Sequence, residues 1–156
     1  MTRQPSLTSI VRRRFLTCVN EHGQSVPDVV NTLQVAPGEL CRIIAGQNIA
    51  HLNINTYYQL ARWLHMPLAN VMALAGARPR MVDLIRLGMQ VAGFRPTSAQ
   101  DQITAAAQAG VSVAVFRRAL HGYASFTPSI RTCDRLAEWL EWTGFHPDDI
   151  ALATGR

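Results

Sequence analysis

The side chains of this sequence that are best suited to chemistry are its arginines, because the residue combinations that build enzyme sites are missing. Its five histidines form no HExxH pattern, and the sequence has neither a glycine-rich phosphate loop nor a GxSxG turn. Cys18, Cys41 and Cys133 are odd in number, far apart and without metal-ligand spacing, so we expect them to be buried free thiols. The sequence therefore predicts a protein that is not an enzyme and uses no metal or cofactor.

The basic charge of the chain favours a polyanionic partner. All 15 basic residues are arginine, and with 10 acidic residues they give a net charge of +5. Guanidinium groups suit bidentate contacts to phosphate and guanine, although arginine usage also follows the base composition of a genome. Four arginines are candidates for contacts to a nucleic-acid backbone, with a solvated helix face as the alternative: Arg12, Arg13, Arg14 and Arg95.

Short amphipathic helices must position these arginines. Leu7 to Asn20 has apolar residues at helical spacing, and Gly23 follows as a stop signal. Ser25 and Asp28 predict a capping box for a second helix that runs to Leu33. The starts of the next three helices are expected at Pro37, Asn53 and Pro67, with Gly46 and Gly76 as stops. An all-α chain follows.

An internal repeat divides the chain. When the sequence is shifted by 76 residues, Arg42 aligns with Arg118 and Gly46 with Gly122. The run Leu60 to Leu64 then aligns with Leu136 to Leu140. Gly76 to Arg80 has the composition of a linker, so we predict two domains of about five helices each, residues 1–77 and 78–156.

Both copies resemble one known family. Gly23 to Val35, followed by Leu40, Arg42, Ile43 and Gly46, resembles the Xre-type, phage-repressor-like helix-turn-helix. The second copy is similar in its Val111-Ser112 turn, in Gly122 and in the Thr127-Pro128-Ser129 segment before its fourth helix. The resemblance implies two tandem five-helix helix-turn-helix domains. It also implies a transcription regulator of bacterial or phage type that binds double-stranded DNA.

The resemblance also implies which residues face the DNA groove. In the first copy these are Pro37, Gly38, Cys41 and Arg42, with Gln47 and Asn48 in the loop that meets phosphates. In the second copy they are Val113, Ala114, Arg117, Arg118, His121 and Tyr123. Pro37 and Gly38 replace polar residues that commonly read bases, and Val26 stands where the family often has a phosphate-binding glutamine. We therefore expect the second copy to make the stronger DNA contact, with a solvated helix face as the alternative for each single arginine.

Apolar residues point to a protein partner as well. Ile44 and Leu120 are apolar where the family is often charged, and Trp142 is a further candidate for an interface. They predict a homodimer or another protein partner, and they keep open a second function as a helical adaptor that has lost DNA reading. With no apolar run of eighteen residues and no signal sequence, we expect no membrane partner and a place in the cytoplasm, at the nucleoid.

Overall fold

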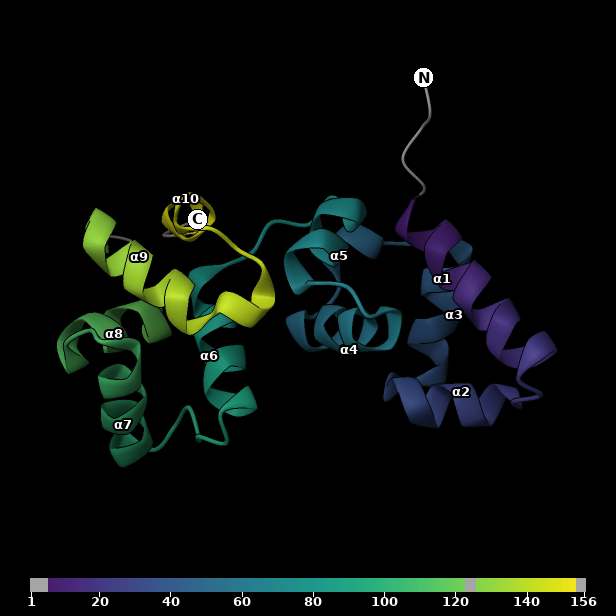
Figure 1. Ribbon diagram of the computed structural model, residues 1–156, viewed down its shortest axis with the longest axis horizontal. Helices are drawn as coiled ribbons and strands as arrows, with labels where there is room; N and C mark the ends of the chain where they lie inside the picture. The colour runs from purple at the N-terminus through teal and green to yellow at the C-terminus, as the bar shows by residue number, and fades with distance from the viewer. Residues whose placement is uncertain (1–5, 123–125, 154–156) are drawn as a thin grey trace, which may run out of the picture. The chain divides into compact units, whose positions relative to one another are not determined.

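The computed structural model describes residues 6–122 and 126–153, and every regular element in these ranges is helical (Figure 1). The all-α class predicted from the sequence is confirmed. The chain divides into two compact units, which we call unit 1 (Met1–Arg78) and unit 2 (Pro79–Arg156). The repeat predicts a boundary one residue earlier, after residue 77.

The described residues of unit 1 form five α-helices, and several of their ends carry recognisable caps. They are α1 (Leu7–Leu16), α2 (Val26–Leu33), α3 (Pro37–Ala45), α4 (Ile54–Leu64) and α5 (Leu68–Ala75). At the start of α2, the amide of Asp28 donates to the Ser25 hydroxyl over 3.2 Å and the amide of Ser25 donates to the Asp28 carboxylate over 3.0 Å. The predicted capping box is therefore present. Gly46 and Gly76 end α3 and α5 with φ of 73° and 70°, a conformation that glycine adopts without steric cost.

The first helix has its predicted extent but changes its winding. α1 continues directly into a π-helical turn, η1 (Thr17–Glu21), in which Cys18 is buried. A period of 3.6 residues does not distinguish these two windings over five residues, so the sequence pattern did not reveal the turn.

In unit 1, one side of α3 is buried in the core. α1 packs on α3 and α5, while α4 packs on α2 and α5. Leu7, Val11, Ile43 and Leu60 are fully buried between these helices, and each such side chain contributes about 1.5–3 kcal/mol relative to exposure. Because Ile43 and Leu40 point inward, the opposite side of α3 faces solvent.

Unit 2 repeats the helix order of unit 1. Its helices are α6 (Met81–Val91), α7 (Ala99–Ala109), α8 (Val113–His121), α9 (Ile130–Trp139) and α10 (Pro147–Leu152). The bounds of α3 and α8 differ by the 76 positions of the sequence repeat. The amide of Met81 donates to the carbonyl oxygen of Ala153 over 3.0 Å, which joins the two ends of the unit.

The core of unit 2 fixes α8 against α6 and α7, and α9 against α7 and α10. Phe116 of α8 meets Trp139 of α9 edge to face, with ring centroids 5.7 Å apart and an interplanar angle of 75°. Gly88 of α6 lies so close that an added Cβ would come within 2.8 Å of the Trp139 ring and 2.7 Å of Leu140. The lack of a side chain at Gly88 is thus what allows α6 to approach the end of α9.

Candidate nucleic-acid interface

The outer face of α8 brings together most of the residues predicted to face DNA in the second copy. The hydroxyl of Ser112 caps the helix by accepting from the amide of Val115 over 3.2 Å. The inner face is buried and consists of Phe116, Ala119 and Leu120. Ala114, Arg118 and His121 are exposed on the opposite face, with Val113 and Arg117 half-buried beside them. The remaining predicted residue, Tyr123, lies outside the described residues.

Arg117 is held in place by a residue that the sequence analysis did not single out. Its Nε donates to Oε1 of Gln102 on α7 over 3.0 Å, and Nε2 of Gln102 donates to the carbonyl oxygen of Pro96 over 2.7 Å. Gln102 is only 7% exposed, so this chain of hydrogen bonds is part of the fold. The terminal nitrogens of the guanidinium remain as further donors, and an anchored guanidinium loses less side-chain entropy when it binds.

The 76-residue repeat could have identified Gln102 as a residue of interest. This residue lies 76 positions after Val26, the site where the family resemblance implies a phosphate-binding glutamine. Val26 is 52% exposed on α2, whereas Gln102 is turned inward. The side-chain amide of Gln102 therefore contacts Arg117, and the structure does not support a direct contact between Gln102 and phosphate.

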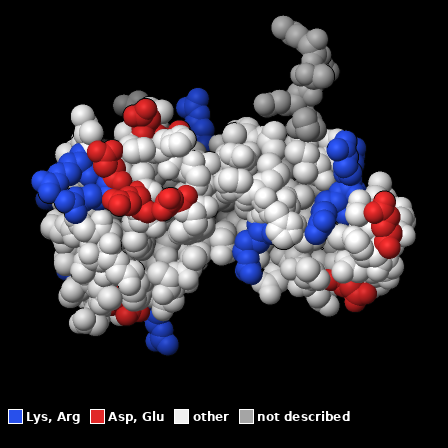
Figure 2. Space-filling model, viewed as in Figure 1, with Lys and Arg blue, Asp and Glu red and all other residues white. Residues whose placement is uncertain are grey.

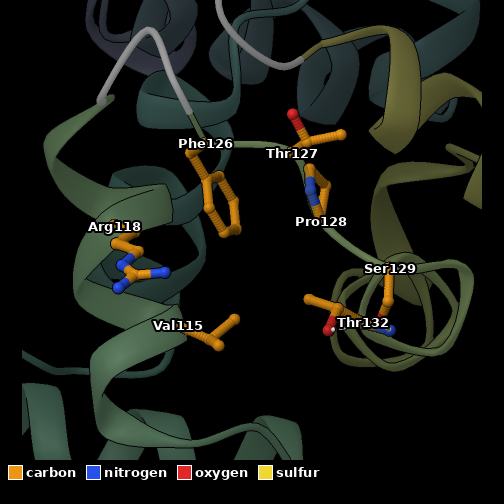
Figure 3. A pocket seen from close by; sticks show the side chains of 7 residues that line it. All are labelled: Val115, Arg118, Phe126, Thr127, Pro128, Ser129 and Thr132. Carbon is orange, nitrogen blue, oxygen red and sulfur yellow. Dashed lines mark hydrogen bonds between the residues drawn. The ribbon is translucent and has the colours of Figure 1, made fainter.

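Arg118 borders a pocket of about 530 Å³ between α8 and the start of α9 (Figure 3). Arg118 and Val115 project from α8, Pro128 and Thr132 lie on the opposite side of the space, and the Phe126 ring enters it from above (Figure 3). The hydroxyl-bearing side chains that line it are Thr127, Ser129 and Thr132. A guanidinium next to hydroxyl groups is a suitable environment for a phosphate oxygen.

One difference between the two units changes the chemistry of this space. In unit 1, Thr56 of α4 donates a hydrogen bond of 2.8 Å to the carboxylate of Glu39 on α3. The residues 76 positions later are Thr132 and Val115, and valine has no acceptor for such a bond. Thr132 instead accepts from the hydroxyl of Ser129 over 3.0 Å. Unit 2 thereby lacks both the bridge and the negative charge at this place.

In unit 2, the segment around α8 is more positive than the unit as a whole, which favours DNA binding there. Residues 1–78 contain seven arginines and three acidic residues, whereas residues 79–156 contain eight arginines and seven acidic residues. Residues 102–133, however, include three arginines and no Asp or Glu. The surface around α8 and the start of α9 is thus free of repulsive carboxylates from its own segment.

The corresponding face of α3 in unit 1 has fewer donors. Gly38, Cys41 and Arg42 are exposed on one side of the helix, followed by exposed Gln47 and Asn48. The expectation of a buried thiol is therefore wrong for Cys41, whereas Cys18 and Cys133 are buried. Asn48 has φ of 53° and starts a short 3₁₀ turn, η2 (Ile49–His51). Pro37 and Gly38, at the helix start, have no side-chain donor, so Arg42 is the main polar group that α3 offers to a base edge.

Two of the four candidate backbone-contacting arginines, Arg12 and Arg14, make side-chain contacts within their own unit. Arg12 Nε donates to the carbonyl oxygen of Ile44 over 2.7 Å, which satisfies a free carbonyl in the last turn of α3. Arg14 is half-buried with its guanidinium 5.9 Å from the ring centroid of Trp63. A backbone contact from Arg14 stays a prediction, and its half-buried position disfavours the solvated helix face. Arg13 and Arg95 are exposed.

The three residues predicted to form a protein interface differ in their exposure to solvent. Leu120 is only 1% exposed, so its prediction as an interface residue is wrong. Phe116, Ala119 and Leu120 follow the three- and four-residue spacing of one buried stripe, and this spacing overrides the family resemblance. Ile44 is half-buried, whereas Trp142, in the 3₁₀ turn η3 (Glu141–Thr143), is 40% exposed.

Other chemistries find little support in the described residues. No group of three or more His, Cys, Asp or Glu side chains in residues 6–122 and 126–153 could hold a metal ion. Asp148 and Asp149 lie in the first turn of α10, where the Asp149 carboxylate accepts from the amide of His146 over 2.9 Å. Within the same ranges, no helix has the length and apolar character needed to cross a bilayer.

Comparison with protein-family models, with curated proteins and with solved structures found no match for this chain.

Proposed function

We propose that this chain is a double-stranded-DNA-binding transcription regulator built from two phage-repressor-like helix-turn-helix units, and that unit 2 makes the principal DNA contact. The observation that carries the proposal is the outer face of α8. Arg117 and Arg118 lie there in a segment without carboxylates, next to a pocket lined by hydroxyl groups.

The geometry of α8 suggests a division of roles among its side chains. A major groove about 12 Å wide admits one α-helix, so α8 would enter it with its exposed face toward the bases. Arg118 is exposed, and Arg117 is aligned by Gln102, so both can donate two hydrogen bonds to guanine or phosphate. Val113 and Ala114 offer apolar contact to a thymine methyl group. Thr127 and Thr132 could donate to a backbone phosphate, whereas the Ser129 hydroxyl already donates to Thr132.

The experiment that tests this proposal measures binding of the full chain to genomic duplex fragments over a series of salt concentrations. We expect Arg117→Ala/Arg118→Ala to weaken binding by about 100-fold, because each bidentate arginine contributes about 1–3 kcal/mol. The slope of log K against log salt should fall by about two for the two lost cationic contacts.

A double variant elsewhere in unit 2 serves as the matched control. Arg80 and Arg86 are exposed at the start and in the middle of α6, so Arg80→Ala/Arg86→Ala removes the same charge without changing α8. This control should keep most of the affinity and a slope within about one of the wild type. Equal losses in both double variants would show a diffuse charge effect and contradict a specific role for α8.

A second candidate function, an adaptor that binds another protein or a second copy of the chain, is favoured by two apolar side chains in unit 2. Trp142 is 40% exposed and Leu152 at the end of α10 is 85% exposed, and tryptophan is enriched in protein interfaces. Sedimentation of the wild type and of Trp142→Ser/Leu152→Ser tests self-association. A monomeric wild type that also fails to bind DNA at low salt would leave a different protein as the partner.

A further inference from the structure

Unit 1 contains a second pocket, on the side formed by the ends of α2 and α4. It has a volume of about 250 Å³. The nitrogen-bearing side chains that line it are two guanidinium groups, one imidazole and two amides: Arg14, Arg62, His65, Gln34 and Gln59. No carboxylate is among the lining residues.

Each of the two arginines of this pocket lies against an aromatic ring. The guanidinium of Arg14 lies 5.9 Å from the centroid of Trp63, and that of Arg62 lies 5.8 Å from the centroid of Tyr58. Within residues 6–122 and 126–153, neither forms an ion pair with a carboxylate. The Nε of Arg14 is buried without a hydrogen-bond partner in the same ranges. With two guanidinium groups and no carboxylate among its lining residues, the pocket favours an anion that neutralises the pair.

The corresponding place in unit 2 has the opposite character. The repeat aligns Arg62 with Glu138, and Glu141 follows Leu140 as His65 follows Leu64. Figure 2 shows acidic side chains gathered beside α9 in unit 2. Arg135 stands where unit 1 has Gln59, and it donates over 3.0 Å to the carbonyl oxygen of Gly110, the cap of α7. The cationic pocket is therefore a property of unit 1 and does not follow from the shared fold.

This pocket is separate from the face of α3 that would approach DNA. The Glu39–Thr56 hydrogen bond joins α3 to the first turn of α4, whereas Arg62 and His65 lie in and just after its last turn. An 11-residue helix is about 16 Å long. A ligand in the pocket would therefore bind away from the exposed residues of α3.

We propose that this pocket binds a small ligand through an oxyanion group, a phosphate or a carboxylate. The volume equals that of about eight water molecules, which is room for inorganic phosphate or a short dicarboxylate. The planar fork of each guanidinium matches two oxygens of either group, while Gln34 and Gln59 supply amide donors. Thr32 contributes little, because its hydroxyl already donates to the carbonyl oxygen of Asp28 over 2.9 Å.

The test is a titration of the ¹⁵N-labelled full chain with inorganic phosphate and, separately, with malonate at constant ionic strength. The indole N–H signal of Trp63 reports on the site, because Arg14 lies against its ring. We expect a saturable shift of this signal up to about 50 mM, a concentration that saturates a site of millimolar affinity. Saturation by phosphate alone assigns a phosphate ligand, and saturation by malonate alone assigns a carboxylate ligand.

Three variants make the outcome specific to the pocket. Arg62→Gln should weaken anion binding at least tenfold, and a folded Arg14→Gln should do the same. Because Arg62 is exposed, Arg62→Gln should fold and remains informative even where Arg14→Gln does not fold. Arg13→Gln removes an exposed arginine next to Arg14 and should bind like the wild type. Arg118→Ala should also bind like the wild type, whether or not the chain binds DNA. No saturable shift with either anion, or an equal loss in Arg13→Gln and Arg62→Gln, would overturn the proposal.

Discussion

The Nε atom of Arg117 donates a hydrogen bond of 3.0 Å to Oε1 of Gln102, so an arginine of α8 is held by a buried amide of α7. The same amide donates to the carbonyl oxygen of Pro96 in the connection before α7. The orientation of a candidate DNA-contacting side chain is thereby linked to the packing of two other segments. Stability and DNA affinity should respond together when this link is removed.

Gln102→Ala should lower the free energy of unfolding by about 1–3 kcal/mol, because a partly buried carbonyl oxygen and a charged donor lose their partner. Duplex affinity should fall by up to about tenfold, because Arg117 must then be ordered on binding. Gln102→Glu should keep an acceptor for Arg117 but lose the donor to the Pro96 carbonyl oxygen, so stability also falls, and the new charge should lower the DNA affinity by neutralising Arg117. Urea unfolding and duplex titration measure the two effects, with exposed Gln100→Ala as control. Wild-type affinity in both Gln102 variants would show that Arg117 makes no DNA contact.

Val115→Glu and Glu39→Val each give one unit the residue type of the other, and they should differ in their effects on stability and on DNA binding. Val115→Glu places a carboxylate opposite Thr132, as Glu39 stands opposite Thr56 in unit 1, and next to Arg118. We expect unchanged or slightly higher stability and at least tenfold weaker DNA binding, because the new charge repels phosphate. Glu39→Val should cost about 1 kcal/mol of stability through the lost hydrogen bond and leave DNA binding nearly unchanged. The reverse ranking of the two affinities would place the principal contact in unit 1.

Two helical glycines should respond in opposite directions to an added methyl group. At Gly38 of α3 a Cβ would meet nothing within 4 Å, so Gly38→Ala should stabilise the chain by about 0.4–1 kcal/mol through the unfolded state. At Gly88 the Cβ would come within 2.8 Å of the Trp139 ring, so Gly88→Ala should destabilise by about 1–3 kcal/mol. Thermal unfolding followed by circular dichroism distinguishes them. A stabilising Gly88→Ala would mean that α6 and α9 are packed less closely than the structure shows.

The capping box of α2 should give a stability contribution that disappears in acid. The amide of Ser25, and then its hydroxyl, hold the pKa of Asp28 below 3.8. Because this pKa is lowered in the folded state, the contribution is present above pH 3.8 and is lost as pH falls through the folded pKa. The difference in unfolding free energy between wild type and Asp28→Ala should therefore be constant near neutral pH and shrink in strong acid. A difference that does not change with pH would show that the carboxylate charge plays no part in the cap.

Features encoded by neighbouring residues could be predicted from the sequence. Ser25 and Asp28 are three residues apart, and Gly46 and Gly76 directly follow the helices that they end, so short-range rules place these ends. The shift of 76 residues that aligns the two copies likewise aligns α8 with α3. These elements depend on interactions within a turn or two of helix.

Features that depend on packing between distant segments were missed or misjudged. The resemblance placed Leu120 at the surface, but the helical stripe that it shares with Phe116 turns it toward the core. Gln102 and Arg117 are 15 residues apart on different helices, and Arg14 meets Trp63 across 49 residues. Helix periodicity indicates which side of a helix is buried, but not which side chain of another helix lies opposite it.

The Glu39–Thr56 hydrogen bond of unit 1 has no equivalent between Val115 and Thr132, and this asymmetry has an evolutionary consequence. After duplication of a unit, a change at one position is enough to make the two copies unequal. Both copies are translated as one chain, so every molecule contains one of each in fixed stoichiometry, without selection for pairing between different gene products. One copy is then free to drift toward a new ligand while the other retains the ancestral one.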